Sequence, residues 1–248
     1  MRRTILITGA SSGLGEGMAR EYAKRGHNLA LCARRLENLE QLKQECESLH
    51  ADCRVEIRAL DVNDHDAVFS VFREFEAFFG KIDRIIINAG MGKGASIGTG
   101  YFEANKQTAM TNFVAALAQC EAAMEIFRKQ NDGHLVTISS ISAVRGFRRA
   151  LTVYAATKAG LTSLTEGIRI DVMKTPIKVT TVHPGFIRTD INAKVKNVPF
   201  IVDLDTGCKA LVKAIDKESS NCYVPAWPWA WMHYVLRIAP LSWLAKMS

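Results

Sequence analysis

The chain has 248 residues, of which 48% are hydrophobic and 23% are charged. This balance is typical of a soluble globular protein and excludes a disordered, collagen-like or coiled-coil chain. The formal net charge is +7, but the basic residues are dispersed along the chain in short doublets. Because nucleic-acid binding depends on clustered cations, we expect no nucleic-acid partner.

The six cysteines form no CxxC pair, and the first residues hold too short an apolar stretch for a secretory signal. We therefore expect reduced thiols and a cytoplasmic protein. The most hydrophobic region, residues 223–245, is interrupted by prolines and by charged residues. A membrane-spanning helix is not expected there.

Short β-branched and aliphatic runs alternate with helical patterns along the chain. The runs lie at 4–8, 28–33, 55–60, 84–89, 134–139, 178–183 and 222–224. Between them apolar residues recur every three to four positions, as over 36–49 and 68–79, which predicts amphipathic helices. The runs are apolar at nearly every position, which indicates burial on both faces of a parallel sheet. Because no repeat or linker divides the chain, the sequence predicts one doubly wound α/β domain over residues 1–248.

A glycine-rich turn joins the first predicted strand to a helix. Its sequence is Thr8-Gly9-Ala10-Ser11-Ser12-Gly13-Leu14-Gly15. Backbone without Cβ atoms can approach a pyrophosphate, whose charge is stabilised by the N–H groups and the dipole of the following helix. The alternative is a tight turn with no ligand, but its place after the first strand favours a dinucleotide site.

The type of dinucleotide depends on the end of the second predicted strand, where an acid would bind a ribose 2′-hydroxyl. The chain has Ala33-Arg34-Arg35 at this place, so no acid is present and a guanidinium suits a 2′-phosphate. We therefore predict NADP(H) rather than NAD(H), with Arg34 as the main contact. In the alternative, both arginines are the first residues of a solvent-exposed helix and bind no cofactor.

Tyr154 and Lys158 are four residues apart in a segment, 152–173, that has a helical pattern. This spacing places both side chains on one face of a helix. A free tyrosine has a pKa of about 10 and exchanges protons poorly at neutral pH. A lysine cation about 4 Å away would lower that pKa by about 3 units, to near neutrality, at an effective dielectric constant of about 20. The pair therefore suits proton transfer by Tyr154, although a Tyr-x3-Lys pair on its own is more often structural.

These motifs together resemble the short-chain dehydrogenase/reductase family. The glycine spacing Gly-x3-Gly-x-Gly is followed, in family order, by Asp61-Val62, Asn88-Ala89-Gly90, Asn112, Ser139-Ser140, Tyr154-x3-Lys158, Pro184-Gly185 and Thr189. The resemblance spans residues 8–189 and implies a Rossmann-type parallel sheet of seven strands. It also implies an oxidoreductase acting on a carbonyl or secondary alcohol, assembled as a homodimer or homotetramer through the long helices that begin near Tyr101 and Thr152.

The resemblance implies a role for each matching position. Tyr154 would be the acid in carbonyl reduction, Ser140 would hold the substrate oxygen, and Asn112 would hold a water that relays protons through Lys158. Cofactor contacts would come from Gly9, Ser11, Ser12, Gly13, Leu14, Gly15, Arg34, Arg35, Asp61, Val62, Asn88, Ala89, Gly90, Tyr154, Lys158, Pro184, Gly185, Ile187 and Thr189. The six histidines form no H-x3-H pair and the family uses no catalytic metal, so no metal site is expected.

Some positions leave alternatives open. Tyr154 follows Ser140 by 14 positions, one more than is common in the family, so Ser139 or Ser142 could instead take the serine role. We expect the extra residue to bulge in the loop near Arg148. Ser12 stands where NADP-type relatives often have a second basic residue. Asp61 either accepts a hydrogen bond from the adenine amino group or caps the next helix.

All four tryptophans lie in an aromatic-rich C-terminal segment, residues 223–248. Trp227, Trp229, Trp231 and Trp243, next to Arg237 and Lys246, suit a peripheral membrane contact, a lid over a hydrophobic substrate, a subunit contact or packing on the chain's own domain. With Phe186 and the stretch 192–201, this segment predicts a small apolar carbonyl or alcohol substrate.

The alternative function is a non-catalytic NADPH-binding sensor or scaffold, against which the intact Ser140, Tyr154 and Lys158 argue.

Overall fold

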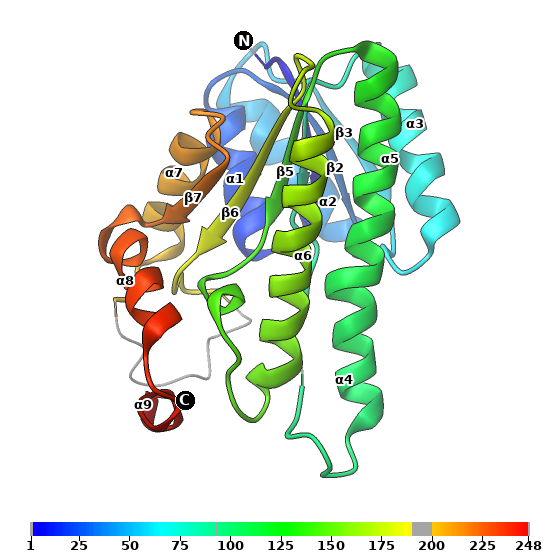
Figure 1. Cartoon of the computed structure of the whole chain (residues 1–248). Helices are drawn as coiled ribbons and strands as arrows, with labels where there is room; N and C mark the ends of the chain where they lie inside the picture. The colour runs from blue at the N-terminus through cyan, green and yellow to red at the C-terminus, as the bar shows by residue number, and fades with distance from the viewer. Residues whose placement is uncertain (1, 93, 190–199, 248) are drawn as a thin grey trace.

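The computed structural model describes residues 2–92, 94–189 and 200–247 of the chain. Within these residues a parallel sheet of seven strands has the order β3-β2-β1-β4-β5-β6-β7 (Figure 1). The strands are β1 (Thr4–Thr8), β2 (Asn28–Ala33), β3 (Val55–Ala59), β4 (Arg84–Ile87), β5 (His134–Ile138), β6 (Lys178–Pro184) and β7 (Asn221–Val224). The predicted doubly wound parallel sheet is confirmed, and each predicted strand is present with small differences at its ends.

Helices cover both faces of the sheet (Figure 1). One face packs against α1 (Gly13–Ala23), α2 (Leu36–Leu49) and α7 (Leu204–Ile215), and the other against α3 (His65–Phe79), α5 (Ala115–Gln130) and α6 (Leu151–Asp171). In β1, Ile5 and Ile7 lie in the first core and Leu6 lies in the second. Full burial of one such side chain contributes about 1.5–3 kcal/mol, so nearly continuous apolar strands stabilise both layers at once.

The remaining helical segments lie near the carboxyl ends of the strands. α4 (Phe102–Ala109) continues through a π-helical turn, η1 (Met110–Val114), into α5, and a short 3-10 helix, η2 (Ile141–Val144), precedes α6. The C-terminal segment forms α8 (Ala226–Ile238) and α9 (Leu241–Met247). No helix in the described part of the chain is long and apolar enough to cross a bilayer.

The order of the strands reverses between β1 and β4. The chain adds β2 and β3 on one side of β1, and β4 to β7 on the other side. In open parallel sheets, ligands bind beside the carboxyl ends of the strands at such a reversal. The glycine turn follows β1 and Asn88 follows β4, so the topology brings these two motifs together.

Candidate functional site

The glycine turn after β1 is held by the residues that follow β4. Gly9 has a φ of 65°, a left-handed conformation that favours glycine. A Cβ on Gly15 would collide with the carbonyl of Gly9. Asn88 Nδ2 donates to the Thr8 carbonyl at 2.9 Å, and Thr8 Oγ1 accepts from the Asn88 amide at 3.1 Å. The Asn88 side chain therefore fixes the turn, while Ala89 lies in contact range of Gly9.

The turn leads into an open helix N-terminus. α1 begins at Gly13, and among the described residues the side chain of the N-cap residue, Ser12, makes no capping hydrogen bond. N–H groups in the first turn of a helix bind anions, so this end of α1 fits a pyrophosphate. Thr189 lies across the turn, since its Cγ2 is 3.6 Å from the place of a Cβ on Gly13. Leu14 is half-buried beside it.

Arg35 reaches over the same turn. Its guanidinium donates to Ser12 Oγ at 2.6 Å and to Ser11 Oγ at 3.2 Å. Both Arg34 and Arg35 are exposed, and only Arg35 is shown in contact with this turn in the described structure. Both arginines stand at the amino end of α2, where the helix dipole disfavours cations. Such a placement suits an anion bound between them. The structure brings Arg35, rather than the predicted main contact Arg34, to the glycine turn.

Asp61 follows β3 at the same edge of the sheet, next to the buried Val62. Asp61 Oδ1 accepts hydrogen bonds from the amide and Nδ2 of Asn63, both at 3.0 Å. Asp64 caps α3 instead, accepting from the Ala67 amide at 3.1 Å. The alternative in which Asp61 caps this helix is wrong, and its contact with adenine stays a prediction.

Ser140 and Tyr154 meet at the carboxyl end of β5. The Ser140 hydroxyl lies close enough to the Tyr154 phenol to lower its pKa, and Ser140 Oγ accepts from the Ser142 amide at 3.1 Å. Ser139 lies on the other side and bonds to Thr162 Oγ1 at 2.8 Å. Of the three candidate serines, Ser140 is therefore the one that the structure pairs with Tyr154.

The loop between these two residues accommodates the additional position. Arg149 has a φ of 58° in the turn that precedes α6. This left-handed residue lies next to Arg148, where the bulge is expected, and both side chains are exposed. That the additional position bulges out of this loop stays a prediction.

Lys158 is buried one turn of α6 beyond Tyr154. Its Nζ donates to the Ile138 carbonyl at 2.8 Å and lies 5.9 Å from the centroid of the Tyr154 ring. Burial lowers the pKa of Lys158 to about 8. Burial also raises the pKa of Tyr154, and the nearby Ser140 hydroxyl opposes that rise. The expected lowering of the Tyr154 pKa is not seen, because burial disfavours the phenolate and the ammonium donates to the Ile138 carbonyl rather than to the phenol.

Asn112 lies on the π-helical turn η1, beside Lys158 of α6. A Cβ on Gly90 would be 3.3 Å from Asn112 Oδ1 and 3.5 Å from Lys158 Nζ, so both side chains border this glycine. Asn112 Oδ1 accepts from the Met91 amide and Nδ2 donates to the Met91 carbonyl, both at 2.8 Å. π-helical turns often occur at functional sites, and this one places Asn112 against the segment after β4.

Comparison with known proteins identifies the family. The family model for short chain dehydrogenases matches residues 3–198. An uncharacterized oxidoreductase of Mycobacterium tuberculosis is 48% identical over 239 residues, covering 96% of this chain and 94% of its own. The chain belongs to the short-chain dehydrogenases. It is thus an oxidoreductase of this type, with a fold that binds a nicotinamide cofactor.

Two further relatives carry more specific names. An NADP-dependent 3-hydroxy acid dehydrogenase of Schizosaccharomyces pombe is 32% identical over 195 residues, covering 77% of this dehydrogenase and 73% of its own chain. The crystal structure of 3-oxoacyl-[acyl-carrier protein] reductase from Brucella melitensis in complex with NAD has a TM-score of 0.80 and 25% identity. It covers 90% of this dehydrogenase and 95% of its own chain.

The C-terminal segment of this dehydrogenase packs against the chain that follows Pro184. A Cβ on Gly185 would collide with Trp229, which is buried in α8. The Trp229 ring meets Phe186 edge to face, with centroids 5.4 Å apart, and Ile187 is also buried. The inner side of α8 is therefore packed on its own domain. Of the stretch 192–201, residues 192–199 lie outside the described part of the structure, as does the side chain of Lys246.

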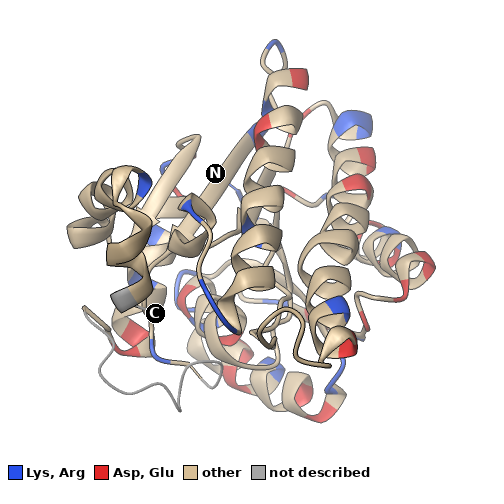
Figure 2. Cartoon of the chain, turned by 60° about the horizontal axis from the view of Figure 1, so that its bottom comes forward, with Lys and Arg blue, Asp and Glu red and all other residues tan. Residues whose placement is uncertain are grey.

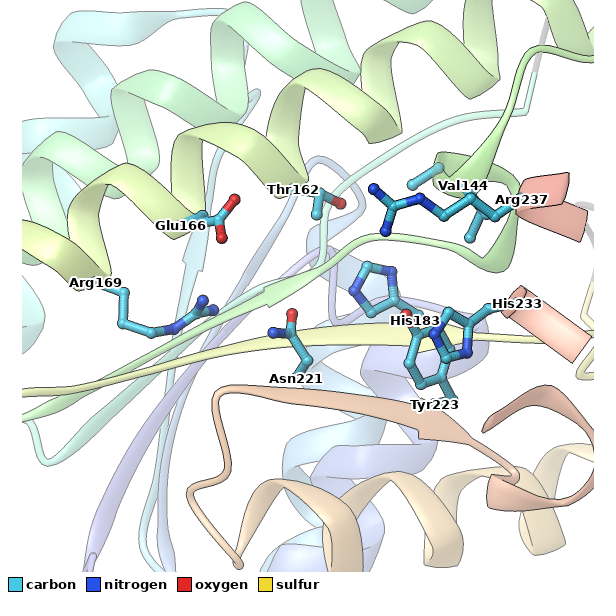
Figure 3. Close-up of a pocket in the computed structure, with 10 residues that line it drawn as sticks. Val144, Thr162, Glu166, Arg169, His183, Asn221, Tyr223, His233 and Arg237 are labelled. Carbon is cyan, nitrogen blue, oxygen red and sulfur yellow. The ribbon is translucent and has the colours of Figure 1, made fainter. Parts of the chain in front are cut away.

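A pocket of about 330 Å³ lies behind Ser140, between α6, β7 and α8 (Figure 3). His183 Nδ1 is 3.3 Å from the Ser140 carbonyl oxygen, and the Tyr223 ring stacks on His183 and on His233 at centroid distances of 4.9 and 4.1 Å. Arg237 directs its guanidinium into the same space (Figure 3). This stack connects α8 to the backbone of Ser140. It has no local signal in the sequence, because its rings come from three separate elements, β6, β7 and α8.

No group of His, Cys, Asp and Glu side chains suited to a metal ion is found among the residues that the structure describes.

Proposed function

We propose that this dehydrogenase uses NADP(H) to interconvert the carbonyl and alcohol forms of a small apolar substrate, with Tyr154 as proton donor and acceptor. The observation that carries this proposal is the placement of Tyr154 beside Ser140, with the buried Lys158 one helical turn away and its Nζ 5.9 Å from the centroid of the Tyr154 ring. The nicotinamide supplies or accepts the hydride when it is bound.

Each side chain has a separate task in carbonyl reduction. Tyr154 gives its hydroxyl proton to the substrate oxygen. Ser140 donates a hydrogen bond to the negative charge that develops on that oxygen. Lys158 stabilises the phenolate that remains, and its pKa of about 8 suits return of a proton near neutral pH. Asn112 borders Lys158 on the side of Gly90, where the resemblance places a relay water.

The preference for NADP(H) rests on charge at the end of β2. Arg34 and Arg35 stand where an acid would favour NAD(H). The Arg35 guanidinium, 2.6 Å from Ser12 Oγ, also supplies the cation that NADP-type relatives often carry at the position of Ser12. The Schizosaccharomyces pombe relative is named as NADP-dependent, which supports the same preference.

The apolar character of the substrate rests on the aromatic wall beside the carboxyl edge of the sheet. Phe186 and Phe200 both meet the Trp229 ring edge to face, at centroid distances of 5.4 and 6.2 Å. Phe200 is also 55% exposed, so it presents aromatic surface to a molecule at this edge. Such a wall favours hydrocarbon next to the reacting carbonyl.

We also propose a homodimer or homotetramer in the cytoplasm. Phe113, Val114, Val153 and Ala156 line a shallow apolar groove of about 360 Å³ on the outer side of η1 and α6. This is the helical face through which the family associates, and a second copy would cover it. The cytoplasmic assignment is supported by six cysteines that are all free thiols in the structure.

The test is oxidation of NADPH and NADH by the purified protein across small aldehydes, long-chain ketones, acyl thioesters and steroid ketones. We expect consumption of NADPH at least about 10-fold above that of NADH, which corresponds to about 1.4 kcal/mol, and higher rates with larger apolar substrates. Tight NADPH binding without turnover of any carbonyl would support the sensor or scaffold alternative, against which the assembled Ser140, Tyr154 and Lys158 argue.

A further inference from the structure

The C-terminal helices leave a row of large apolar side chains uncovered. Trp227, Trp231, Tyr234, Ile238 and Leu241 are 78%, 59%, 63%, 83% and 73% exposed. Trp231, Tyr234 and Ile238 recur at spacings of three and four and therefore share one face of α8. We call these five residues the tail stripe. An exposed patch of this kind marks an interaction site, because single exposed apolar residues are common but contiguous ones are not.

The opposite face of α8 fixes the helix on the protein. Trp229 and Leu236, each 4% exposed, pack with Ile141 in a third core below the tail. Arg145 donates to the Ala239 carbonyl at the end of α8. The tail stripe is thus presented by an anchored helix, and its exposure follows from the way the helix packs.

The tail segment and the loop before α6 carry cations but no acids. Residues 133–165 and 219–248 contain no Asp or Glu, and the exposed cations Arg148, Arg149 and Arg237 lie in these segments. Figure 2 shows blue but no red on the loop before α6 and on α8. A second copy docked symmetrically on this face would bring these cations toward their equivalents in the partner. An anionic lipid surface offers the opposite charge.

We propose that this face docks on an anionic lipid bilayer, with the tail stripe among the headgroups and first acyl carbons and with Arg148 and Arg149 on the phosphates. Tryptophan and tyrosine favour this boundary, and each arginine near an anionic surface adds to the attraction. The contact is interfacial, which agrees with helices too short or too polar to span a bilayer in the described chain.

Docking in this orientation also turns the candidate active site toward the bilayer. The strands point their carboxyl ends toward the end of the molecule where α9 and the start of α6 lie (Figure 1). Ser140 follows β5 at that end, so its surroundings face the same side as α9. A lipid-dissolved carbonyl would then have a short route to the site. The docking itself depends on neither the proposed cofactor nor the proposed substrate.

The test is sedimentation of the full-length protein with vesicles of phosphatidylcholine alone and of phosphatidylcholine mixed with phosphatidylglycerol. We expect about 10-fold more protein on the anionic vesicles, with a loss of binding at high salt. All four tryptophans lie at 227–243, so their emission reports on the tail alone and should shift to the blue on binding.

The decisive variant is Trp231→Ser combined with Ile238→Ser, which changes only exposed side chains. We expect it to lose about 10-fold in binding to anionic vesicles while its melting temperature and NADPH binding stay unchanged. The matched control is Ile170→Ser combined with Met173→Ser, two side chains that are 63% and 73% exposed, at the far end of α6 and just beyond it. The control should bind as the wild type does.

Several results would overturn the proposal. These are no binding of the wild type to anionic vesicles, equal binding to neutral ones, or equal binding of the wild type and the tail-stripe variant. A tail-stripe variant that dissociates into monomers in sedimentation equilibrium, with no vesicle binding by the wild type, would assign the face to a second copy instead.

Discussion

Lys158 Nζ and the Ile138 carbonyl oxygen are joined by a 2.8 Å hydrogen bond at the carboxyl end of β5. The bond ties α6 to the strand that leads into Ser140. Among the described residues, no other hydrogen bond is shown for this ammonium. The Lys158 side chain is buried, and that burial lowers its pKa to about 8. The lysine is therefore near its titration point at physiological pH, with consequences for rate and for stability.

The first prediction concerns the pH dependence of the rate. We expect kcat/KM for carbonyl reduction to fall as the pH rises through about 8, because Lys158 then loses the charge that stabilises the Tyr154 phenolate. Lys158→Arg keeps its charge to much higher pH, so its alkaline limb should lie at least about one pH unit higher. The measurement is a pH profile of both proteins, and an alkaline limb at the same pH in both would exclude Lys158 as its origin.

The second prediction concerns stability. The pKa of Lys158 falls from 10.5 to about 8 on folding. Below pH 8 the folded chain therefore holds a buried charge, which lowers the free energy of unfolding. This destabilisation becomes smaller as the pH rises from 8 to 10.5. Lys158→Met removes that charge but leaves the Ile138 carbonyl without its donor. The free energy of unfolding should rise by about 2 kcal/mol at neutral pH and by less at high pH. Urea denaturation at both pH values measures this, and a variant less stable than wild type at neutral pH would contradict it.

The third prediction concerns cofactor preference. Arg34→Ala combined with Arg35→Ala should lower the ratio of kcat/KM for NADPH over NADH by about 100-fold, since each charged hydrogen bond contributes about 1.5–3 kcal/mol. Use of NADH itself should change little. Arg73→Ala, on the exposed side of α3, is the matched control and should leave the ratio unchanged. Equal losses with both cofactors would show that the two arginines do not bind a 2′-phosphate.

The fold was predictable because the signals that specify it are local. Runs such as 28–33 are apolar at every buried position, and the residues between strands keep the period of a helix. A parallel sheet follows from burial on both faces, and the glycine turn and Asn88 end neighbouring strands. The positions of the site motifs at one edge of the sheet therefore followed from sequence patterns and from family resemblance together.

Details of the site depend on contacts that no sequence pattern encodes. Arg35 rather than Arg34 contacts the glycine turn, because the Arg35 guanidinium donates to Ser12 Oγ. Ser140 rather than Ser139 lies beside Tyr154, because the Ser139 hydroxyl bonds to Thr162. The expected fall of the Tyr154 pKa assumed an ammonium about 4 Å from the charge, whereas the fold directs that ammonium elsewhere. The stack of two histidines on Tyr223 combines three distant segments and has no spacing signature.

The fourth prediction separates two adjacent serines. Ser140→Ala should lower kcat by about 10²–10³-fold, the usual effect of removing a donor to a developing oxyanion. Ser139→Ala should lower the melting temperature, because its hydroxyl bonds to Thr162 and to the Lys158 carbonyl, but should retain most of kcat. Steady-state kinetics and thermal melts of both variants measure this. The assignment fails if Ser139→Ala is the variant with the larger loss of kcat.

The central claim is that the Tyr154 hydroxyl transfers the proton, and Tyr154→Phe removes that oxygen alone. The measurements are the rate of NADPH oxidation with the best carbonyl of the panel and the Kd of NADPH. The matched control is Tyr101→Phe, because Tyr101 is exposed at the start of α4. General acid catalysis contributes about 10²–10⁴-fold, so we expect kcat to fall by about 10³-fold while NADPH affinity stays within about 2-fold. Turnover by Tyr154→Phe at a rate near that of the wild type and of Tyr101→Phe would contradict the account.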